Sequence, residues 1–214
     1  MMTTPNVAPR GLLFLIVGPG GAGKDTLMQA VIERLHDDPQ HALLPVVTAT
    51  TRPMRQGETD GVNYHFISRE RFRQMIDDDE LFEHVEVTSG DYYGTPRASI
   101  EPLLAEGRNL ILDIDVFGTK ALRQFYPQDS VTIFITVPGS GDEERLALLR
   151  QRMEKRGDMD AARVEARLQR AKEIELPFAD SCDYVIVNDD RQRAEQALYD
   201  LVMERMTARL HQTL

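Results

Sequence analysis

The sequence predicts an α/β fold in which a parallel sheet carries helices on both faces. Short, continuous apolar runs recur along the chain with the length and β-branched content of buried strands. Helix patterns lie between these runs, as expected when the strands are parallel and covered on both sides. The predicted strands are Leu12–Val17, Pro45–Thr48, Leu110–Ile114, Val131–Val137 and Tyr184–Val187. The clearest helix patterns are Leu27–Leu35, Ala98–Ala105 and Ala194–Met206.

Length and charge narrow the class of protein. The chain has 214 residues and a formal net charge of −10, with one cysteine, Cys182. At about 150 residues per domain, one domain is expected over residues 11–214, after a flexible tail at 1–10. The negative charge argues against nucleic-acid and anionic-membrane binding. The longest apolar run is far shorter than the roughly 18 residues of a membrane span. We therefore expect a cytoplasmic protein.

Two polar stretches interrupt the alternation of strands and helices. Residues 48–97 are rich in Thr, Arg, Gly and Tyr and contain a short helix near Glu70–Asp77, and residues 139–172 are strongly charged and helical. We interpret the first as a binding subdomain and the second as a lid. Both are inserted into a core made of residues 11–47, 98–138 and 173–214. Ligands of parallel sheets bind at the carboxyl ends of the strands, where such insertions would lie.

A phosphate-binding loop follows the first predicted strand. The segment GPGGAGKDT fits the pattern G-x-x-x-x-G-K, in which glycines turn backbone N–H groups inward and the lysine reaches the outer phosphates. Its residues are Gly18, Pro19, Gly20, Gly21, Ala22, Gly23, Lys24, Asp25 and Thr26. Asp25 occupies the position where Ser or Thr normally contacts Mg²⁺. Either Thr26 or a water replaces that hydroxyl, or Asp25 itself acts at the metal.

The segment from Thr50 to Phe66 indicates a second anion site. Arg52 and Arg55 flank Pro53, and planar guanidinium groups suit a bidentate grip on phosphate. Further on come residues with hydroxyl donors or room for close backbone approach: Tyr64, Tyr93, Gly94 and Thr95. Each alone is more often structural, but together they favour phosphate binding.

These motifs together resemble the bacterial guanylate kinases. The matching blocks, in the family's order, are GPGGAGK (18–24), TTRPMRQGE with YHF (50–66), FEHVEV and GDYYGT (82–95), LDID (112–115), RMEKRG (152–157) and YVIVNDD (184–190). The resemblance implies a P-loop nucleoside monophosphate kinase fold with a GMP-binding subdomain and a helical lid. It implies transfer of the γ-phosphoryl group of ATP to GMP, or dGMP, with Mg²⁺ as cofactor. Phe117 stands where the family leads us to expect glutamine.

The resemblance also assigns roles to individual residues. Guanine offers donors at N1–H and the 2-amino group, which carboxylates can accept. The implied GMP site is Thr48, Arg52, Arg55, Tyr64, Glu83, Tyr93, Gly94, Thr95 and Asp115. Glu83 lies one residue further from Tyr93 than expected. A bulge near Thr88–Ser89 would accommodate this, and Glu86 is the alternative base reader. Asp113 and Asp115 are two apart on a predicted strand, so we expect them to share a face.

The implied donor site comprises the phosphate loop and Asn188, with Mg²⁺ held through the ATP phosphates and by Asp25, Thr26 or Asp113. The implied catalytic residues are Lys24, Arg52, Asp113 and the lid arginines Arg156 and Arg167. For Asp190, which follows the last predicted strand, a role as helix N-cap is as good an explanation as a place in the adenine pocket. Two other functions remain open from sequence: a ribose 1,5-bisphosphate phosphokinase of the same fold, and a non-catalytic guanylate-kinase-like binding module. The sequence does not indicate an oligomeric state.

Overall fold

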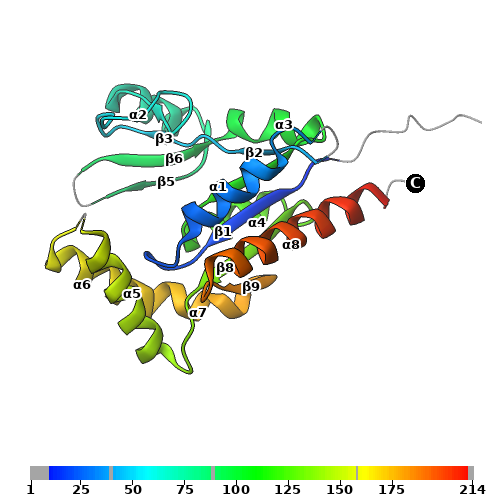
Figure 1. Ribbon diagram of the computed structural model, residues 1–214. Coiled ribbons are helices and arrows are strands. Elements are labelled where there is room, and N and C mark those ends of the chain that lie inside the picture. The colour runs from blue at the N-terminus through cyan, green and yellow to red at the C-terminus, as the bar shows by residue number, and fades with distance from the viewer. Residues whose placement is uncertain (1–9, 39–40, 88–89, 158, 212–214) are drawn as a thin grey trace, which may run out of the picture.

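The main sheet is entirely parallel, which confirms the predicted fold class (Figure 1). The computed structural model describes residues 10–38, 41–87, 90–157 and 159–211, so residues 1–9 of the predicted tail lie outside the described part. The strand order is β2-β7-β1-β8-β9. The strands are β1 (Leu13–Val17), β2 (Leu43–Pro45), β7 (Asn109–Asp113), β8 (Ser130–Thr136) and β9 (Tyr184–Val187).

The predicted strand Pro45–Thr48 is wrong in its bounds. Strand β2 covers Leu43–Pro45, and the amide of Val46 makes one more bond, to the carbonyl of Ile111 at 2.9 Å. The chain then leaves the main sheet and enters a second sheet at Ala49. Of the predicted run only Pro45 lies in β2, and residues 46–48 connect the main sheet to the second one, which periodicity alone could not reveal.

Strand β1 divides the core into two layers. Phe14 and Ile16 belong to the cluster formed with helices α1 (Lys24–Leu35) and α8 (Arg191–His211). Leu13 and Leu15 belong to the cluster formed with α3 (Glu101–Ala105) and α4 (Val116–Phe125). Alternate residues of a strand point to opposite faces, so the unbroken apolar sequence of β1 is what two covered faces require.

The first insertion forms a second sheet of four strands in the order β4-β3-β6-β5. These are β3 (Ala49–Thr50), β4 (His65–Phe66), β5 (Leu81–Glu86) and β6 (Tyr92–Pro96), and helix α2 (Arg69–Asp77) packs on them through buried Phe72. Ser68 caps α2 by accepting a hydrogen bond from the amide of Arg71 at 3.1 Å. The predicted short helix near 70–77 is confirmed.

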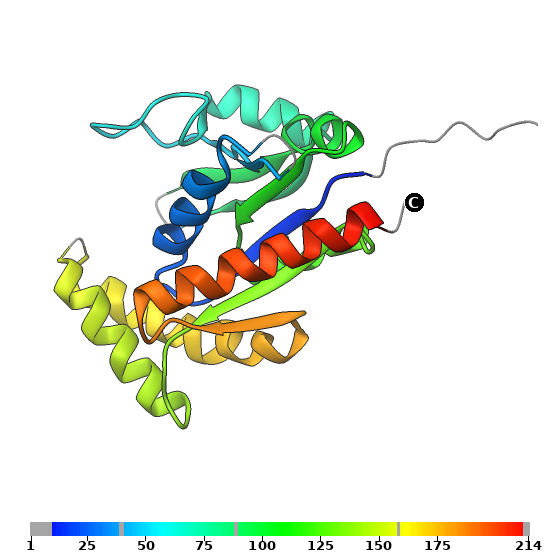
Figure 2. The same ribbon diagram turned by 45° about the vertical axis from the view of Figure 1, so that its right-hand side comes forward.

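The second insertion is helical, as predicted. It contains α5 (Asp142–Arg156) and α6 (Ala161–Arg170), followed by the π-helical turn η2 (Ala171–Glu175) and α7 (Leu176–Phe178). Short 3-10 turns lie at Arg97–Ser99 (η1) and Ala179–Ser181 (η3). Both insertions project beyond the same end of the main sheet, the end to which β1 points (Figures 1 and 2). No helix among the described residues is long and apolar enough to cross a membrane.

Helix α8 anchors the core, and Leu198 at its centre has no exposed surface. We expect Leu198→Ala to lower the free energy of unfolding by about 2–5 kcal/mol, because a cavity is left in a packed layer. The control is Leu210→Ala on the same helix, where the side chain is 45% exposed and a change within about 0.5 kcal/mol is expected. Urea titration measures both. Equal effects of the two substitutions would contradict this account of the core.

Candidate active site

The phosphate loop joins the carboxyl end of β1 to the first turn of α1. Gly18 and Gly23 have φ of +148° and +91°, which side chains rarely adopt. A Cβ at Gly18 would lie 2.1 Å from the carbonyl oxygen of Ile135, and one at Gly23 would lie 2.5 Å from Nδ2 of Asn188. The loop is therefore packed tightly against β8 and the residue after β9, and it ends at a helix N-terminus whose amides suit an anion.

Lys24 lies among carboxylates at the start of α1. Its Nζ donates to the carbonyl of Gly18 at 2.9 Å and lies 3.8 Å from Oδ2 of Asp113. Burial raises the pKa of Asp113 to about 7; Lys24 opposes that shift, whereas Asp25 and Glu175 add to it. Burial likewise raises the pKa of Glu175. Acids from α1, β7 and η2 are thus near enough to one another and to Lys24 for their charges to interact.

Asn188 fastens the loop to the end of β9. Its buried side chain donates from Nδ2 to the carbonyl of Ala22 at 2.8 Å, and its own carbonyl accepts from Arg152 at 2.8 Å. Asp190 caps α8 by accepting from the amide of Arg193 at 2.9 Å, which confirms the capping alternative. These contacts give Asn188 a structural role, and its contact with ATP stays a prediction.

Arg52 is the centre of the second anion site. The guanidinium group donates to both carboxylate oxygens of Glu58, at 2.7 and 2.5 Å, and lies over the rings of Tyr64 and Phe66 at 5.2 and 5.4 Å. The hydrogen bond from Arg52 lowers the pKa of Glu58 to about 2, and the same bond raises the pKa of Arg52. The fork of Arg52 is therefore held in a fixed orientation by a carboxylate.

Tyr64 connects this cluster to the phosphate loop. Its ring lies 5.9 Å from that of Tyr93, edge to face. Burial is the main reason why the pKa of Tyr64 is raised, and the charges of Asp113 and Asp25 raise it further. The phenol thus lies close enough to the acids around Lys24 to be affected by their charge. The predicted second anion site therefore lies near the predicted phosphate site at the carboxyl end of β1.

Glu83 points toward α4. Its Oε1 accepts from the buried hydroxyl of Thr95 at 2.6 Å, and a Cβ at Gly118 would lie 3.3 Å from its Cγ. Burial raises the pKa of Glu83, and the neighbouring charge of Asp115 adds to the effect. Glu86 instead accepts from the hydroxyl of Tyr92 at 3.1 Å, at the far end of β5. This placement favours Glu83 as the base reader.

The irregular pairing of β5 with β6 lies between Leu81 and His84, beside Glu83 itself. The predicted bulge near Thr88–Ser89 falls on residues outside the described part of the chain. Gly94 on β6 is explained by packing, because a Cβ there would lie 2.9 Å from the carbonyl oxygen of Glu83 and 3.0 Å from Phe72.

Asp113 and Asp115 do not share a strand, and this prediction is wrong. Strand β7 ends at Asp113, and Asp115 is the N-cap of α4, accepting from the amide of Gly118 at 2.8 Å. Its second oxygen, Oδ2, accepts from Arg170 at 2.7 Å. Asp113 thus lies beside Lys24, while Asp115 lies beside Glu83.

The two predicted lid arginines lie on different helices. Arg167, on α6, reaches the phosphate loop: its Nη1 is 2.8 Å from the position that a Cβ at Gly20 would occupy. Arg156 is the exposed last residue of α5. Of the remaining predicted residues, Arg55 contributes its amide to Glu58 at 2.7 Å, and Thr48 accepts at its carbonyl from His65 at 2.8 Å. Thr26 lies exposed on the first turn of α1.

Sequence reasoning missed three polar residues at this edge. Glu58 lies in the same matching block as Arg52, so its position in that block could have indicated a role at the site. Arg170 and Glu175 give no such signal, because their positions depend on the π-helical turn. Cys182 has no assigned role, and burial raises the pKa of its thiol to about 11, which disfavours a reactive thiolate.

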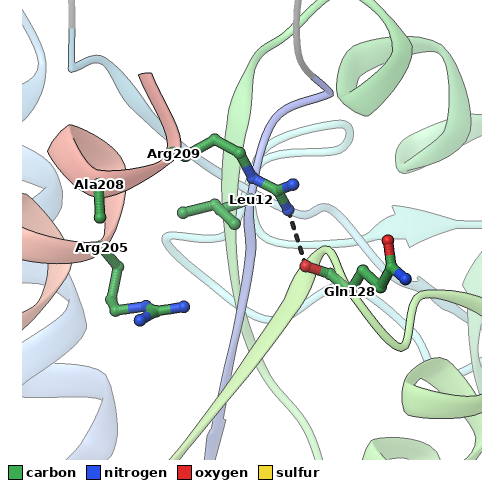
Figure 3. A pocket seen from close by; sticks show the side chains of 5 residues that line it. All are labelled: Leu12, Gln128, Arg205, Ala208 and Arg209. Carbon is green, nitrogen blue, oxygen red and sulfur yellow. Dashed lines mark hydrogen bonds between the residues drawn. The ribbon is translucent and has the colours of Figure 1, made fainter. Parts of the chain in front are cut away.

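A cavity of about 320 Å³ lies at the opposite end of the sheet, at the amino ends of β1 and β8 (Figure 3). It is lined by Leu12, Gln128, Arg205, Ala208 and Arg209. Arg209 is engaged there, since it donates to the carbonyl of Gln128 at 2.8 Å. The amino ends of parallel strands are not where ligands bind in such sheets, and the phosphate loop lies at the other edge.

Comparison with known proteins agrees with this geometry. The guanylate kinase family model matches residues 10–205. The chain belongs to the guanylate kinase family. It is 40% identical to the guanylate kinase of Clostridium perfringens strain SM101 over 95% of this chain and 88% of the relative. It is also 40% identical to that of Maricaulis maris, over 94% and 86%.

A solved structure extends the family likeness to the fold. The crystal structure of guanylate kinase from Anaplasma phagocytophilum matches with a TM-score of 0.66 and 27% identity, covering 92% of this chain and 87% of the other. As a member of this family the protein is a kinase, a transferase of phosphoryl groups.

The raised pKa of Asp113 predicts a pH-dependent stability without nucleotide. Its unfolded carboxyl group ionises near 3.8 and the folded one at about 7, so raising the pH between these values favours unfolding. Asparagine cannot ionise. We therefore expect the melting temperature of Asp113→Asn to exceed that of the wild type increasingly between about pH 5 and 7, and the difference to level off above. A difference that shrinks over this range would contradict the assignment.

Proposed function

We propose that this member of the guanylate kinase family transfers the γ-phosphoryl group of ATP to GMP, giving ADP and GDP. The proposal rests on two neighbouring features: the phosphate loop with Lys24, and the Arg52–Tyr64–Tyr93 cluster, whose Tyr64 is near enough to Asp113 and Asp25 for their charges to affect its pKa. A donor site and an acceptor site at one edge of the sheet suit phosphoryl transfer, which depends on bringing two phosphates into line.

Arg52 is suited to the acceptor phosphate. Glu58 already engages its fork with two oxygens, as a phosphate group would, and the rings beneath it restrict its movement. Tyr64 and Tyr93 add hydroxyl donors beside it, and Arg55 adds a second guanidinium group. The phosphate of GMP is itself a competent nucleophile, so a general base is not needed.

Glu83 and Asp115 are suited to select guanine. Their carboxyl groups lie near one another at the start of α4, and both accept hydrogen bonds. A buried acceptor left unpaired by the wrong base penalises that base strongly. Thr48 and Thr95 complete the proposed base pocket, in which adenine would lack the matching donors.

Mg²⁺ is the cofactor that the acids at Lys24 fit. The described residues contain no cluster of three or more metal-ligating side chains, so the protein alone does not make a complete metal site. Burial, with the nearby charges of Asp25 and Glu175, raises the pKa of Asp113, and an added cation would favour its charged form. We propose that Asp113 and Asp25 or Thr26 hold the ion together with the ATP phosphates, where it would neutralise charge on them.

Arginines of the proposed lid would neutralise the remaining negative charge on the phosphates. Lys24 and the loop amides bind the ATP phosphates, Arg167 lies over Gly20, and Arg156 ends the neighbouring helix. Closure of α5 and α6 would bring them onto the transferred group and exclude water. We also propose that the protein acts in the cytoplasm.

The alternatives fit less well. A non-catalytic module would not need an intact phosphate loop, and a sugar-bisphosphate kinase would not need carboxylates beside the acceptor pocket. Release of ADP from Mg-ATP with GMP, dGMP, AMP or ribose 1,5-bisphosphate as acceptor distinguishes them. Turnover should be fast with GMP. Turnover with the sugar bisphosphate and none with GMP would contradict the proposal.

Lys24→Ala should reduce kcat with GMP by at least about a thousandfold, because the charge on the transferred group loses its fixed partner. GMP should still bind, because its proposed contacts Arg52, Tyr64 and Tyr93 remain in place. Steady-state assays and calorimetry measure the two quantities. Retention of a tenth or more of wild-type kcat would remove Lys24 from the catalytic set.

Arg52→Ala should weaken GMP binding about ten- to a hundredfold, the effect of losing charge-assisted hydrogen bonds. Arg73→Ala, on the exposed surface of α2, is the control of equal charge change. Calorimetric titration with GMP compares the three proteins. Unchanged GMP affinity in Arg52→Ala would remove its assigned role.

Glu83→Gln and Glu86→Gln form a matched pair three residues apart on β5. Replacing Glu83 should raise KM for GMP at least about tenfold, because an amide offers a donor where guanine presents donors. Replacing Glu86, which contacts Tyr92, should change KM less than about twofold. The reverse result would assign base recognition to Glu86.

A further inference from the structure

Helix α6 carries two arginines that reach opposite sides of the active site. Arg167 lies over Gly20 in the phosphate loop, and Arg170 donates from Nη2 to Oδ2 of Asp115 at 2.7 Å. Residues three apart lie on one face of a helix. One face of one lid helix therefore contacts both the donor side and the proposed base pocket.

The π-helical turn η2 keeps Arg170 in this position. Arg170 is the last residue of α6, and its Nε donates to Oε1 of Glu175 at 3.3 Å, across the turn. In a regular α-helix, residues five apart point in different directions at 100° per residue. The wider π-turn brings them to one face, and π-turns occur often at functional sites. Glu175 is also close enough to Lys24 for the lysine to lower its pKa, although burial raises it overall.

Asp115 is held at both oxygens. Its Oδ1 accepts from the amide of Gly118 at 2.8 Å, and its Oδ2 accepts from Arg170. Each carboxylate oxygen can accept more than one hydrogen bond, so both retain capacity for guanine donors. The guanidinium group of Arg170 also lies 5.9 Å from the ring centroid of exposed Phe117, on the first turn of α4. Arg170 therefore has three neighbours that fix its position, and Asp115 has two that fix its carboxylate.

We propose that Arg170 is a positioning residue that orients Asp115 for guanine and couples the lid to the acceptor pocket. This inference rests on the proposed function. Arg170 acts through Asp115 and touches no reacting atom. Because Arg167 and Arg170 move together on α6, a lid placed to hold Asp115 is also placed to reach the donor phosphates.

The test compares Arg170→Ala, Arg170→Lys and the control Arg163→Ala, an exposed arginine on the same helix. In Arg170→Ala we expect KM for GMP to rise about tenfold. This is a small effect for the loss of a charge-assisted hydrogen bond, because the Arg170–Asp115 pair is partly exposed. KM for ATP should change less than about twofold. Lysine keeps the charge without the fork, so Arg170→Lys should recover part of the GMP affinity. Arg163→Ala should resemble the wild type.

A merely structural role would give a different pattern. It would lower the melting temperature and raise KM for both substrates together, and lysine would not rescue GMP selectively. That pattern, or a KM for GMP within twofold of wild type in Arg170→Ala, would overturn the inference. Wild-type protein that fails to phosphorylate GMP would instead refute the proposed function, so the two failures are distinguishable.

A double-substitution cycle tests whether Arg170 acts through Asp115. GMP affinity is measured by calorimetry in Asp115→Asn, Arg170→Ala and the double variant. If Arg170 acts through Asp115, adding Arg170→Ala to Asp115→Asn changes GMP affinity less than about twofold. A full tenfold loss in the Asp115→Asn background, or loss of GMP binding only in the double variant, would overturn the coupling.

Discussion

The crowding of carboxylates around Lys24 is the constraint on which the rest of this structure depends. Asp25, Asp113 and Glu175 come from α1, β7 and the π-turn, and burial raises the pKa of Asp113 and of Glu175. Lys24 lies beside Asp113, whereas Glu175 pairs with Arg170. The arrangement makes physical sense as a place for a cation and phosphates, which together supply charges of both signs. The tight packing of the loop against β8 and Asn188 holds this site at the carboxyl edge of the sheet.

Both insertions lie at the same end of the main sheet as this site. The first insertion carries Arg52, Tyr64 and Tyr93 near the acids, and α6 places Arg167 over the loop. Glu58 holds the guanidinium group of Arg52 in one orientation, so one side chain of the proposed acceptor site is fixed in place. A preorganised guanidinium group pays less conformational entropy on binding than a free one.

Much of this arrangement could be predicted from the sequence, because it depends on local rules. Apolar runs gave the strand positions within a few residues, and the glycine pattern gave the phosphate loop. Prediction failed where distant contacts decide: only Pro45 of the predicted strand Pro45–Thr48 lies in the main sheet, and Asp115 caps a helix instead of ending a strand. Arg170 and Glu175 escaped notice because a π-turn changes which residues share a face, and no local pattern marks it.

The most direct test of the account is a crystal structure of the protein with ADP, Mg²⁺ and GMP bound together. The account predicts that the β-phosphate of ADP lies in the loop within hydrogen-bond distance of Lys24 Nζ. It predicts that the phosphate of GMP lies at Arg52, Tyr64 and Tyr93, with guanine against Glu83 and Asp115. GMP bound elsewhere, or its phosphate directed away from the loop, would contradict it.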